Sequence, residues 1–96
     1  MPISSDHQKL LFFQVGPVKG CLFSNEIVTL IPPPKKETAG RTGRLPGIFR
    51  HDQRIARVID MRVKFGLSPS SPDSGKIILA EIDKGLFAFW VDNILT

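Results

Sequence analysis

The chain contains few of the residues that build covalent or metal-centred sites. Its 96 residues include one cysteine, Cys21, and two histidines, His7 and His51. A single cysteine excludes an internal disulfide and a metal site made of cysteines alone. The two histidines lie far apart in the chain, and no cluster of cysteines or carboxylates accompanies either of them to complete a metal site. We therefore predict neither a metal nor a cofactor.

Long hydrophobic segments are also absent. No apolar run approaches the ~20 residues that a membrane-spanning helix needs. The opening decapeptide, MPISSDHQKL, lacks the basic and apolar regions of a secretory signal. Together with the lack of disulfides, these absences predict a cytoplasmic protein that does not insert into a membrane.

The apolar residues that are present suffice for one small core. They make up 42% of the chain, which is too large a share for a disordered protein. The length fits a single domain. We expect a flexible N-terminus over residues 1–8 and one domain over residues 9–96.

The net charge of +4 is unevenly distributed. Nine of the chain's 13 lysines and arginines lie between Lys35 and Lys64, and only Glu37, Asp52 and Asp60 oppose them there. Such a basic belt can attract an acidic partner or a polyanion, or it can simply be a solvated surface. Its residues are Lys35, Lys36, Arg41, Arg44, Arg50, Arg54, Arg57, Arg62 and Lys64.

Short apolar stretches between turn residues predict a mainly β, barrel-like fold with little helix. The first two predicted strands form a hairpin around Gly16-Pro17. The last two form a hairpin around residues 83–85, in which Gly85 is suited to positive φ. The predicted strands are 9–15, 19–23, 55–59, 76–82 and 86–91.

The segments between these strands give weaker signals. Residues 24–31 fit either a helical turn or a strand, since possible capping residues precede β-branched ones. Residues 35–44 contain no large apolar side chain and predict a basic surface loop. Residues 60–65 fit one helical turn that ends at Gly66, and residues 68–75 predict a flexible connector.

The central segment 45–67 reads LPGIFRHDQRIARVIDMRVKFGL and is the most informative part of the chain. A polar tetrapeptide precedes its predicted strand. Within that strand Ile55, Val58 and Ile59 carry the apolar pattern. Arg54 and Arg57 are expected to face solvent.

Candidate catalytic groups are sparse. Asp60 and Asp92 each follow an apolar strand. Two such carboxylates can form an acid/base pair, but at strand ends they more often accept hydrogen bonds from turn amides. His51 and Asp52 are sequence neighbours, and on a strand their side chains would point to opposite faces. Cys21 lies in an apolar strand, where we expect it to be buried. As evidence for an enzyme these groups are weak, and enzymatic activity is a third possibility that rests only on Asp60, Asp92 and His51.

A small basic β-barrel that binds single-stranded nucleic acid is the alternative function. Proteins of that kind stack bases on aromatic side chains beside cations. Phe49, next to Arg50, is the best-placed platform. The remaining aromatic residues fall mostly within apolar strands, where core packing is the default.

Five motifs occur in a recognisable order along the chain. They are FQVG (13–16), IVTL (27–30), GIF (47–49), VIDMRVKFG (58–66) and WVDNI (90–94). In order and spacing this set resembles the CheW-like domain, the coupling module of bacterial chemosensory signalling. The resemblance implies a fold of two intertwined small β-barrel subdomains around a shared apolar groove.

The same resemblance implies a non-enzymatic adaptor in bacterial chemotaxis-type signal transduction. Such adaptors bridge the cytoplasmic tip of a chemoreceptor and the regulatory domain of a histidine kinase, or help to assemble a signalling array. By position, the candidates for apolar partner contacts are Ile27, Leu30, Ile48 and Phe49.

Two departures from the family pattern concern charge. Where the family has N-L-R-G, this chain has RHDQ at 50–53, so that Asp52 stands in place of the usual arginine and the turn glycine is lost. Arg57 replaces a proline of the family pattern. Because a reversed charge changes which partner charges are attracted, we expect this region to give a divergent partner preference. Its candidate partner-binding residues are Arg50, His51, Asp52 and Arg54.

Domains of this family continue some tens of residues beyond the V-D-x-V motif, whereas this sequence ends at Thr96. The resemblance therefore implies a domain that is truncated at its C-terminus and has an open sheet edge. We expect a second copy of the chain to cover that edge by strand pairing or exchange, or a binding partner to do so.

Overall fold

The computed structural model describes residues 9–33, 48–71 and 73–95, except for the side chains of Ile48 and Phe49. The segments 1–8 and 35–44, which we expected to be a flexible terminus and a basic loop, lie outside these residues.

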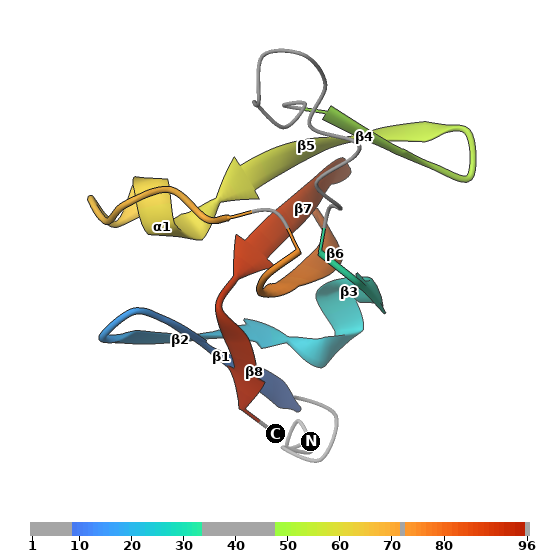
Figure 1. Ribbon diagram of the computed structural model, residues 1–96. Helices are drawn as coiled ribbons and strands as arrows, with labels where there is room; N and C mark the ends of the chain where they lie inside the picture. Colours follow the sequence, from blue (N-terminus) through green and yellow to red (C-terminus); the bar gives the residue numbers. More distant parts are fainter. Residues whose placement is uncertain (1–8, 34–47, 72, 96) are drawn as a thin grey trace, which may run out of the picture.

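The first of two sheets is a small one with the strand order β2-β1-β8. Strands β1 (Leu10–Val15) and β2 (Val18–Phe23) form the predicted hairpin, whose turn places Gly16 at φ +56°. The short strand β8 (Asn93–Leu95) pairs with the other edge of β1. In Figure 1 these three strands lie below the rest of the molecule, and the chain runs directly from β7 down into β8.

The second sheet has five strands in the order β3-β6-β7-β5-β4. Strands β6 (Lys76–Ile82) and β7 (Gly85–Val91) form its central hairpin. Strands β3 (Ile27–Ile31) and β4 (Ile48–His51) are its two edges. Strand β5 (Arg54–Asp60) runs parallel to β7, and the helical turn α1 (Met61–Lys64) begins the connection that makes this possible.

Apolar side chains on the two faces of the five-stranded sheet form two separate clusters. On one face, Ile77, Leu79 and Trp90 lie in a buried cluster that Ala56 of β5 joins. On the other face, Ile78 packs against the inner side of the three-stranded sheet. Strands β6 and β7 are therefore buried on both sides. The sequence predicted this for β7. The second cluster consists of Phe13, Val15, Ile78 and Val91.

The predicted strands and the mainly β fold class are confirmed. The ambiguous segment 24–31 contains both of the expected elements, because the 3-10 helix η2 (Ser24–Glu26) leads directly into β3. The predicted helical turn at 60–65 is α1. Asp60 is its N-cap residue and Gly66 follows it at φ +77°. No helix among the described residues has the length and apolar character needed to cross a membrane.

Two predictions about burial were wrong. Cys21 is exposed, because it lies on the outer face of the three-stranded sheet, where it pairs with the half-exposed Phe12. Ile55 is 56% exposed, and the buried position of β5 is its neighbour Ala56. The covered face of β5 carries Ala56 and Val58, so the expectation held for Val58 and failed for Ile55. Arg54 and Arg57 are exposed, as predicted.

The expected positive φ at Gly85 was also wrong. In the β6–β7 turn, Asp83 and Lys84 have φ values of +51° and +68°, and Gly85 is already part of β7. The β4–β5 turn has the same form, with Asp52 at +48° and Gln53 at +67°. Positive φ at both central residues is the type I′ pattern that suits the twist of a two-residue hairpin.

Candidate functional site

A surface hollow of about 460 Å³ lies where the two sheets meet. Strand β3 and the residue after it contribute Leu30, Ile31 and Pro32, and the other lining residues come from β6 and β8. The wall is mainly aliphatic, with an ammonium group and an amide at its margin. A cleft of this kind suits an apolar side chain or helix face of another protein. The residues that line the hollow are Leu30, Ile31, Pro32, Lys76, Asn93 and Ile94.

The four apolar residues that the sequence suggested for partner contacts do not form one patch. Leu30 is 47% exposed and lines this hollow, so it is available to a partner. Ile27 is half-buried and packs against the cluster around Ile78. Ile48 and Phe49 lie on β4, at the edge of the five-stranded sheet opposite to β3, and their side chains lie outside the described part of the structure.

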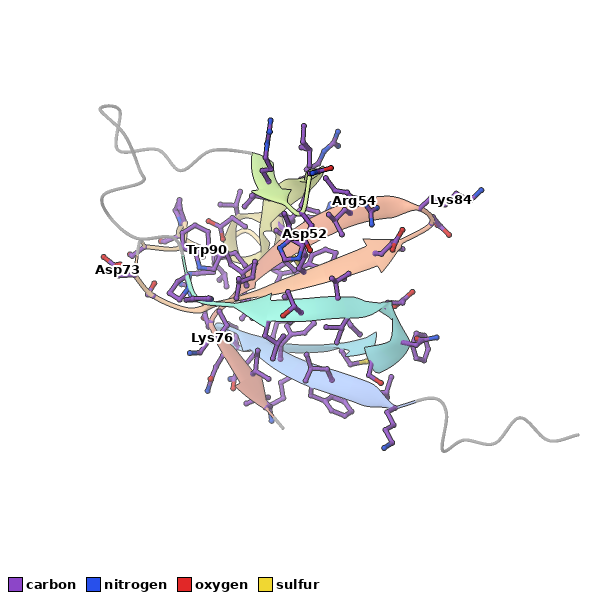
Figure 2. The ribbon with its side chains drawn as sticks, turned by 90° about the vertical axis from the view of Figure 1, so that its right-hand side faces the viewer. Asp52, Arg54, Asp73, Lys76, Lys84 and Trp90 are labelled. Carbon is purple, nitrogen blue, oxygen red and sulfur yellow. The ribbon has the colours of Figure 1, made fainter. Side chains whose placement is uncertain are left out.

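The polar candidates Arg50, His51, Asp52 and Arg54 are brought together by the β4–β5 hairpin. The Asp52 side chain is 88% exposed at the tip of the hairpin, and its Oδ2 atom lies 3.4 Å from His51 Nε2. We expected these two side chains to diverge, which was wrong because Asp52 belongs to the turn and not to a strand. Arg54 donates to Glu81 of β6 at 3.2 Å. Figure 2 shows Asp52 and Arg54 near the β6–β7 hairpin, which carries Lys84 at its tip.

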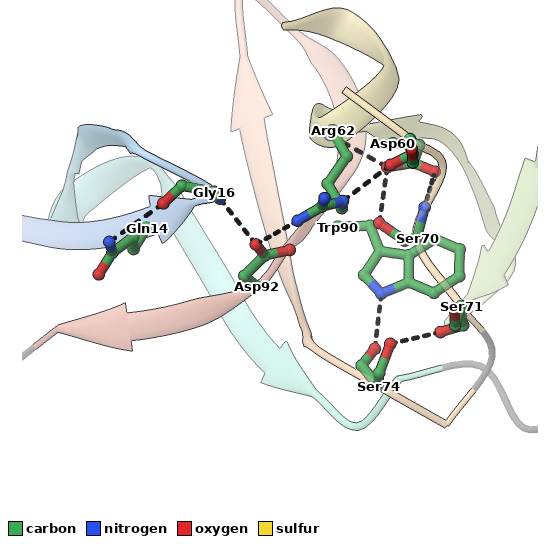
Figure 3. A network of polar contacts seen from close by, with 10 residues as sticks. Gln14, Gly16, Asp60, Arg62, Ser70, Ser71, Ser74, Trp90 and Asp92 are labelled. Carbon is green, nitrogen blue, oxygen red and sulfur yellow. Dashed lines mark hydrogen bonds and ion pairs between the residues drawn. The ribbon is translucent and has the colours of Figure 1, made fainter. Parts of the chain in front are cut away.

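The two strand-end carboxylates accept hydrogen bonds from turn groups, as predicted. Asp60 Oδ1 accepts from the Arg62 amide at 3.1 Å and from Ser70 Oγ at 2.7 Å, and Asp60 Oδ2 accepts from the Ser70 amide at 2.8 Å. Asp92 Oδ2 accepts from the Gly16 amide at 2.7 Å. Arg62 joins the two groups, because its Nη1 atom donates to Asp92 Oδ2 at 2.7 Å (Figure 3).

This arrangement gives both carboxylates a structural role, because the donors that they accept from hold the turn after β5, the connector and the β1–β2 turn in place. The described residues also contain no group of three histidine, cysteine, aspartate or glutamate side chains that could hold a metal ion.

The described residues of the serine-rich segment, 68–71 and 73–75, form hydrogen bonds that a flexible connector would lack. Ser70 is held by Asp60, and the Ser74 carbonyl accepts a 2.9 Å hydrogen bond from the indole of Trp90. The Arg62 guanidinium donates to the Ser68 carbonyl at 2.7 Å. A buried indole N–H needs an acceptor, but the sequence does not show that the acceptor of Trp90 is the Ser74 carbonyl, 16 positions away.

The family model of the CheW-like domain matches residues 9–96. This chain belongs to the CheW-like domain family. The solved structure of the scaffolding protein TtCheW from Thermoanaerobacter tengcongensis has the same fold, with a TM-score of 0.67 and 20% sequence identity. The likeness covers 92% of this chain and 62% of that one, so this chain spans less than two thirds of the length of its structural relative. No curated protein matches the sequence.

In this CheW-like domain the motif at 58–66 has a structural explanation. Val58 packs on the core, and Asp60 caps the helical turn that follows the strand. Arg62 then links that turn to Asp92 of the closing motif. The two family motifs are thus joined by side-chain contacts, and their residues serve mainly to hold β5, α1 and β7 in place.

The basic belt is partly neutralised where it is described. Arg54 and Arg62 form ion pairs with Glu81 and Asp92. Among the described residues, this leaves Arg50, Arg57 and Lys64 as exposed cations of the belt that form no ion pair. The stacking platform that the nucleic-acid alternative required was Phe49, whose side chain lies outside the described part. The described residues therefore do not test that alternative, which stays a prediction, and three other aromatic residues, Phe12, Phe23 and Phe65, are exposed.

Proposed function

We propose that this protein is a non-enzymatic adaptor in a chemotaxis-type signalling complex. Proteins of the CheW-like family are scaffold or adaptor proteins and are generally non-enzymatic. The observation that carries the proposal is the hollow between the two sheets, with the half-exposed Leu30 on its wall. The proposed partners are the regulatory domain of a histidine kinase and the cytoplasmic tip of a chemoreceptor, and the proposed location is the cytoplasm.

Binding in this hollow would be an equilibrium association driven by apolar burial. Leu30, Ile31 and Ile94 offer aliphatic surface, and fully burying one leucine-sized side chain contributes about 1.5–3 kcal/mol. At the margin, Lys76 can donate a hydrogen bond to a partner carboxylate, and the Asn93 side chain can donate to a partner carbonyl. Exposed anchors of this type commonly dominate the energy of an interface.

Replacement of Leu30 by serine tests the proposal, and β3 supplies a matched control. Val28 is also 47% exposed and lies on the same strand, but it does not line the hollow. We expect Leu30→Ser to weaken binding to an immobilised kinase regulatory domain or receptor tip by roughly tenfold or more, equivalent to about 1.4 kcal/mol. Val28→Ser should change the dissociation constant little. Equal effects of the two variants, or no binding by the parent protein, would refute this assignment.

The β4–β5 hairpin is proposed to adjust partner choice. Its exposed charges are arranged around Asp52, which stands where the family pattern has arginine. Charges at the rim of an interface chiefly affect association rate and discrimination between partners. The hollow at Leu30 would then supply the binding affinity. Residues 50–54 would determine whether the protein binds an acidic or a basic partner surface.

We propose that a second copy of the chain pairs with the open β8 edge of the three-stranded sheet. Within the described residues β8 pairs only with β1, through three residue pairs, so its other edge is free. Strand addition at such an edge is a common mode of association. Light scattering over a range of concentrations should reveal a dimer. A monomer of unchanged mass at every concentration would exclude it.

A further inference from the structure

We propose that the five-stranded sheet carries a second docking surface, which binds an acidic amphipathic peptide segment of a partner protein. The surface is a hollow of about 370 Å³ lined by Ile55, Arg57, Gly85, Leu86 and Phe87. It shares no lining residue with the hollow at Leu30. The proposed adaptor would therefore have a second binding site that is independent of the hollow at Leu30.

The strand register places two arginines beside the apolar part of this hollow. Arg57 of β5 is the Cα partner of Phe87 in β7, and Ile55 is the Cα partner of Arg50 in β4. Residues directly opposite each other in neighbouring strands share a face of the sheet. Arg50, Ile55, Arg57 and Phe87 therefore lie on one face, with Ile55 between the two arginines and Phe87 beside Arg57.

Within the described residues, neither Arg50 nor Arg57 forms an ion pair with a carboxylate. The ion pairs there use His51, Arg54 and Arg62. The side chains of Arg50 and Arg57 form no hydrogen bond with any residue that the structure describes. Arg54, on the same strand, alternates to the other face and is paired with Glu81. The hollow thus combines exposed apolar surface with unpaired positive charge, which is complementary to a segment that carries leucine-like and glutamate-like side chains together.

The aromatic wall of the hollow is held in a fixed position. The Phe87 ring stacks on Phe89 at a centroid distance of 5.9 Å. Its edge also lies over Gly85, where an added Cβ would come within 3.0 Å of the ring. Gly85 does not have the positive φ that would explain a glycine. Its small size instead leaves room for the ring beside the hollow.

An acidic peptide fits this surface better than a nucleic acid does. Affinity for a polyanion grows with the number of phosphates that are neutralised, and only two arginines are available here. Base stacking also needs a free aromatic face, whereas Phe87 is half-buried and already stacked. Ile55, which is 56% exposed, provides the main unburied apolar area, and it suits an aliphatic partner.

The test uses a fluorescein-labelled amphipathic helical peptide with leucines on one face and glutamates along its flanks. Its twin has every glutamate replaced by glutamine. Fluorescence anisotropy should show saturable binding of the acidic peptide to the full chain. Arg57→Glu and Ile55→Ser should each weaken that binding by at least about tenfold. Lys19→Glu, the same charge change at an exposed site on β2, should alter it by less than about twofold.

Arg57→Gln, which removes the charge without reversing it, covers the case in which Arg57→Glu does not fold. Circular dichroism of each variant shows which of them are folded. The proposal is overturned if the acidic peptide does not bind, if the glutamine twin binds equally well, or if folded Arg57 variants bind like the parent protein. Tighter binding of a single-stranded oligonucleotide at the same salt concentration would also overturn it.

Discussion

Arg62 and Asp92, which are 30 positions apart in the sequence, form a 2.7 Å ion pair that joins the helical turn α1 to the end of β7. The same carboxylate oxygen accepts the Gly16 amide from the β1–β2 turn. One contact point therefore ties together the five-stranded sheet, the three-stranded sheet and the connection between β5 and β6. Both side chains are about one-third exposed or less, so the pair is only partly screened by solvent.

Loss of the Arg62 side chain should destabilise the fold. Arg62→Ala removes the bond to Asp92 and the bond to the Ser68 carbonyl. We expect the free energy of unfolding to fall by about 1–3 kcal/mol, the range for charge-assisted hydrogen bonds. Lys64→Ala, at an exposed position of the same helical turn, should change it by less than about 0.5 kcal/mol. Urea unfolding measures both, and indistinguishable midpoints would contradict the structural role of Arg62.

The Asp60 side chain should contribute more to stability than the Ser70 hydroxyl does. Asp60→Ala leaves the amides of Arg62 and Ser70 and the Ser70 hydroxyl without their acceptor. Loss of an N-cap costs about 0.5–2 kcal/mol, and the two bonds from Ser70 add to that cost. Ser70→Ala removes only one bond and should cost about 0.5–1.5 kcal/mol. Thermal unfolding ranks the two variants, and the opposite order would show that we have misassigned the capping group.

Two glycines with similar φ values provide a direct comparison of backbone strain and steric overlap. Gly66 has φ +77° and open space around it, so Gly66→Ala should cost roughly 1–2 kcal/mol for the left-handed conformation alone. At Gly75, with φ +81°, an added Cβ would overlap the Val91 carbonyl and contact the indole of Trp90. We expect Gly75→Ala to cost at least about 1 kcal/mol more. Differential scanning calorimetry of the two variants tests this order.

Exchange of Asp52 for arginine should change partner preference more than stability. Asp52→Arg restores the charge of the family pattern at an 88% exposed side chain. Asp52→Asn is the control, because asparagine tolerates the observed φ of +48° and removes the charge without reversing it. We expect the arginine variant to shift the relative affinities for kinase and receptor fragments, measured by titration calorimetry. If neither variant changes the relative affinities, partner choice is determined elsewhere in the chain.

Much of the fold could be predicted from local sequence signals. The strands, the Gly16-Pro17 hairpin and the helical turn after Asp60 follow from alternation, turn residues and capping, which act over a few residues. The role of Asp60 and Asp92 as hydrogen-bond acceptors was predictable for the same reason. The ordered motifs also identified the family, because their spacing reflects the order of the strands that they occupy.

The candidate site was only partly predictable. Leu30 was identified by its position in a family motif, and it lines the hollow between the sheets. Lys76, Asn93 and Ile94 were missed, because each lies on a strand that meets β3 only in the folded chain. Ile27 was included, although it packs against the core, since a motif gives no information about which apolar residues are buried.

The sequence by itself determined which segments become strands, where they turn and to which family the chain belongs. Only the tertiary structure decided which face of each strand is covered. Alternation shows that a strand has two faces, but burial depends on which distant strand packs against it. For that reason Cys21 and Ile55 are exposed, Arg62 finds Asp92, and Ile55, Arg57 and Phe87 share one surface. Each of these outcomes depends on long-range pairing between segments, and no local pattern contains that information.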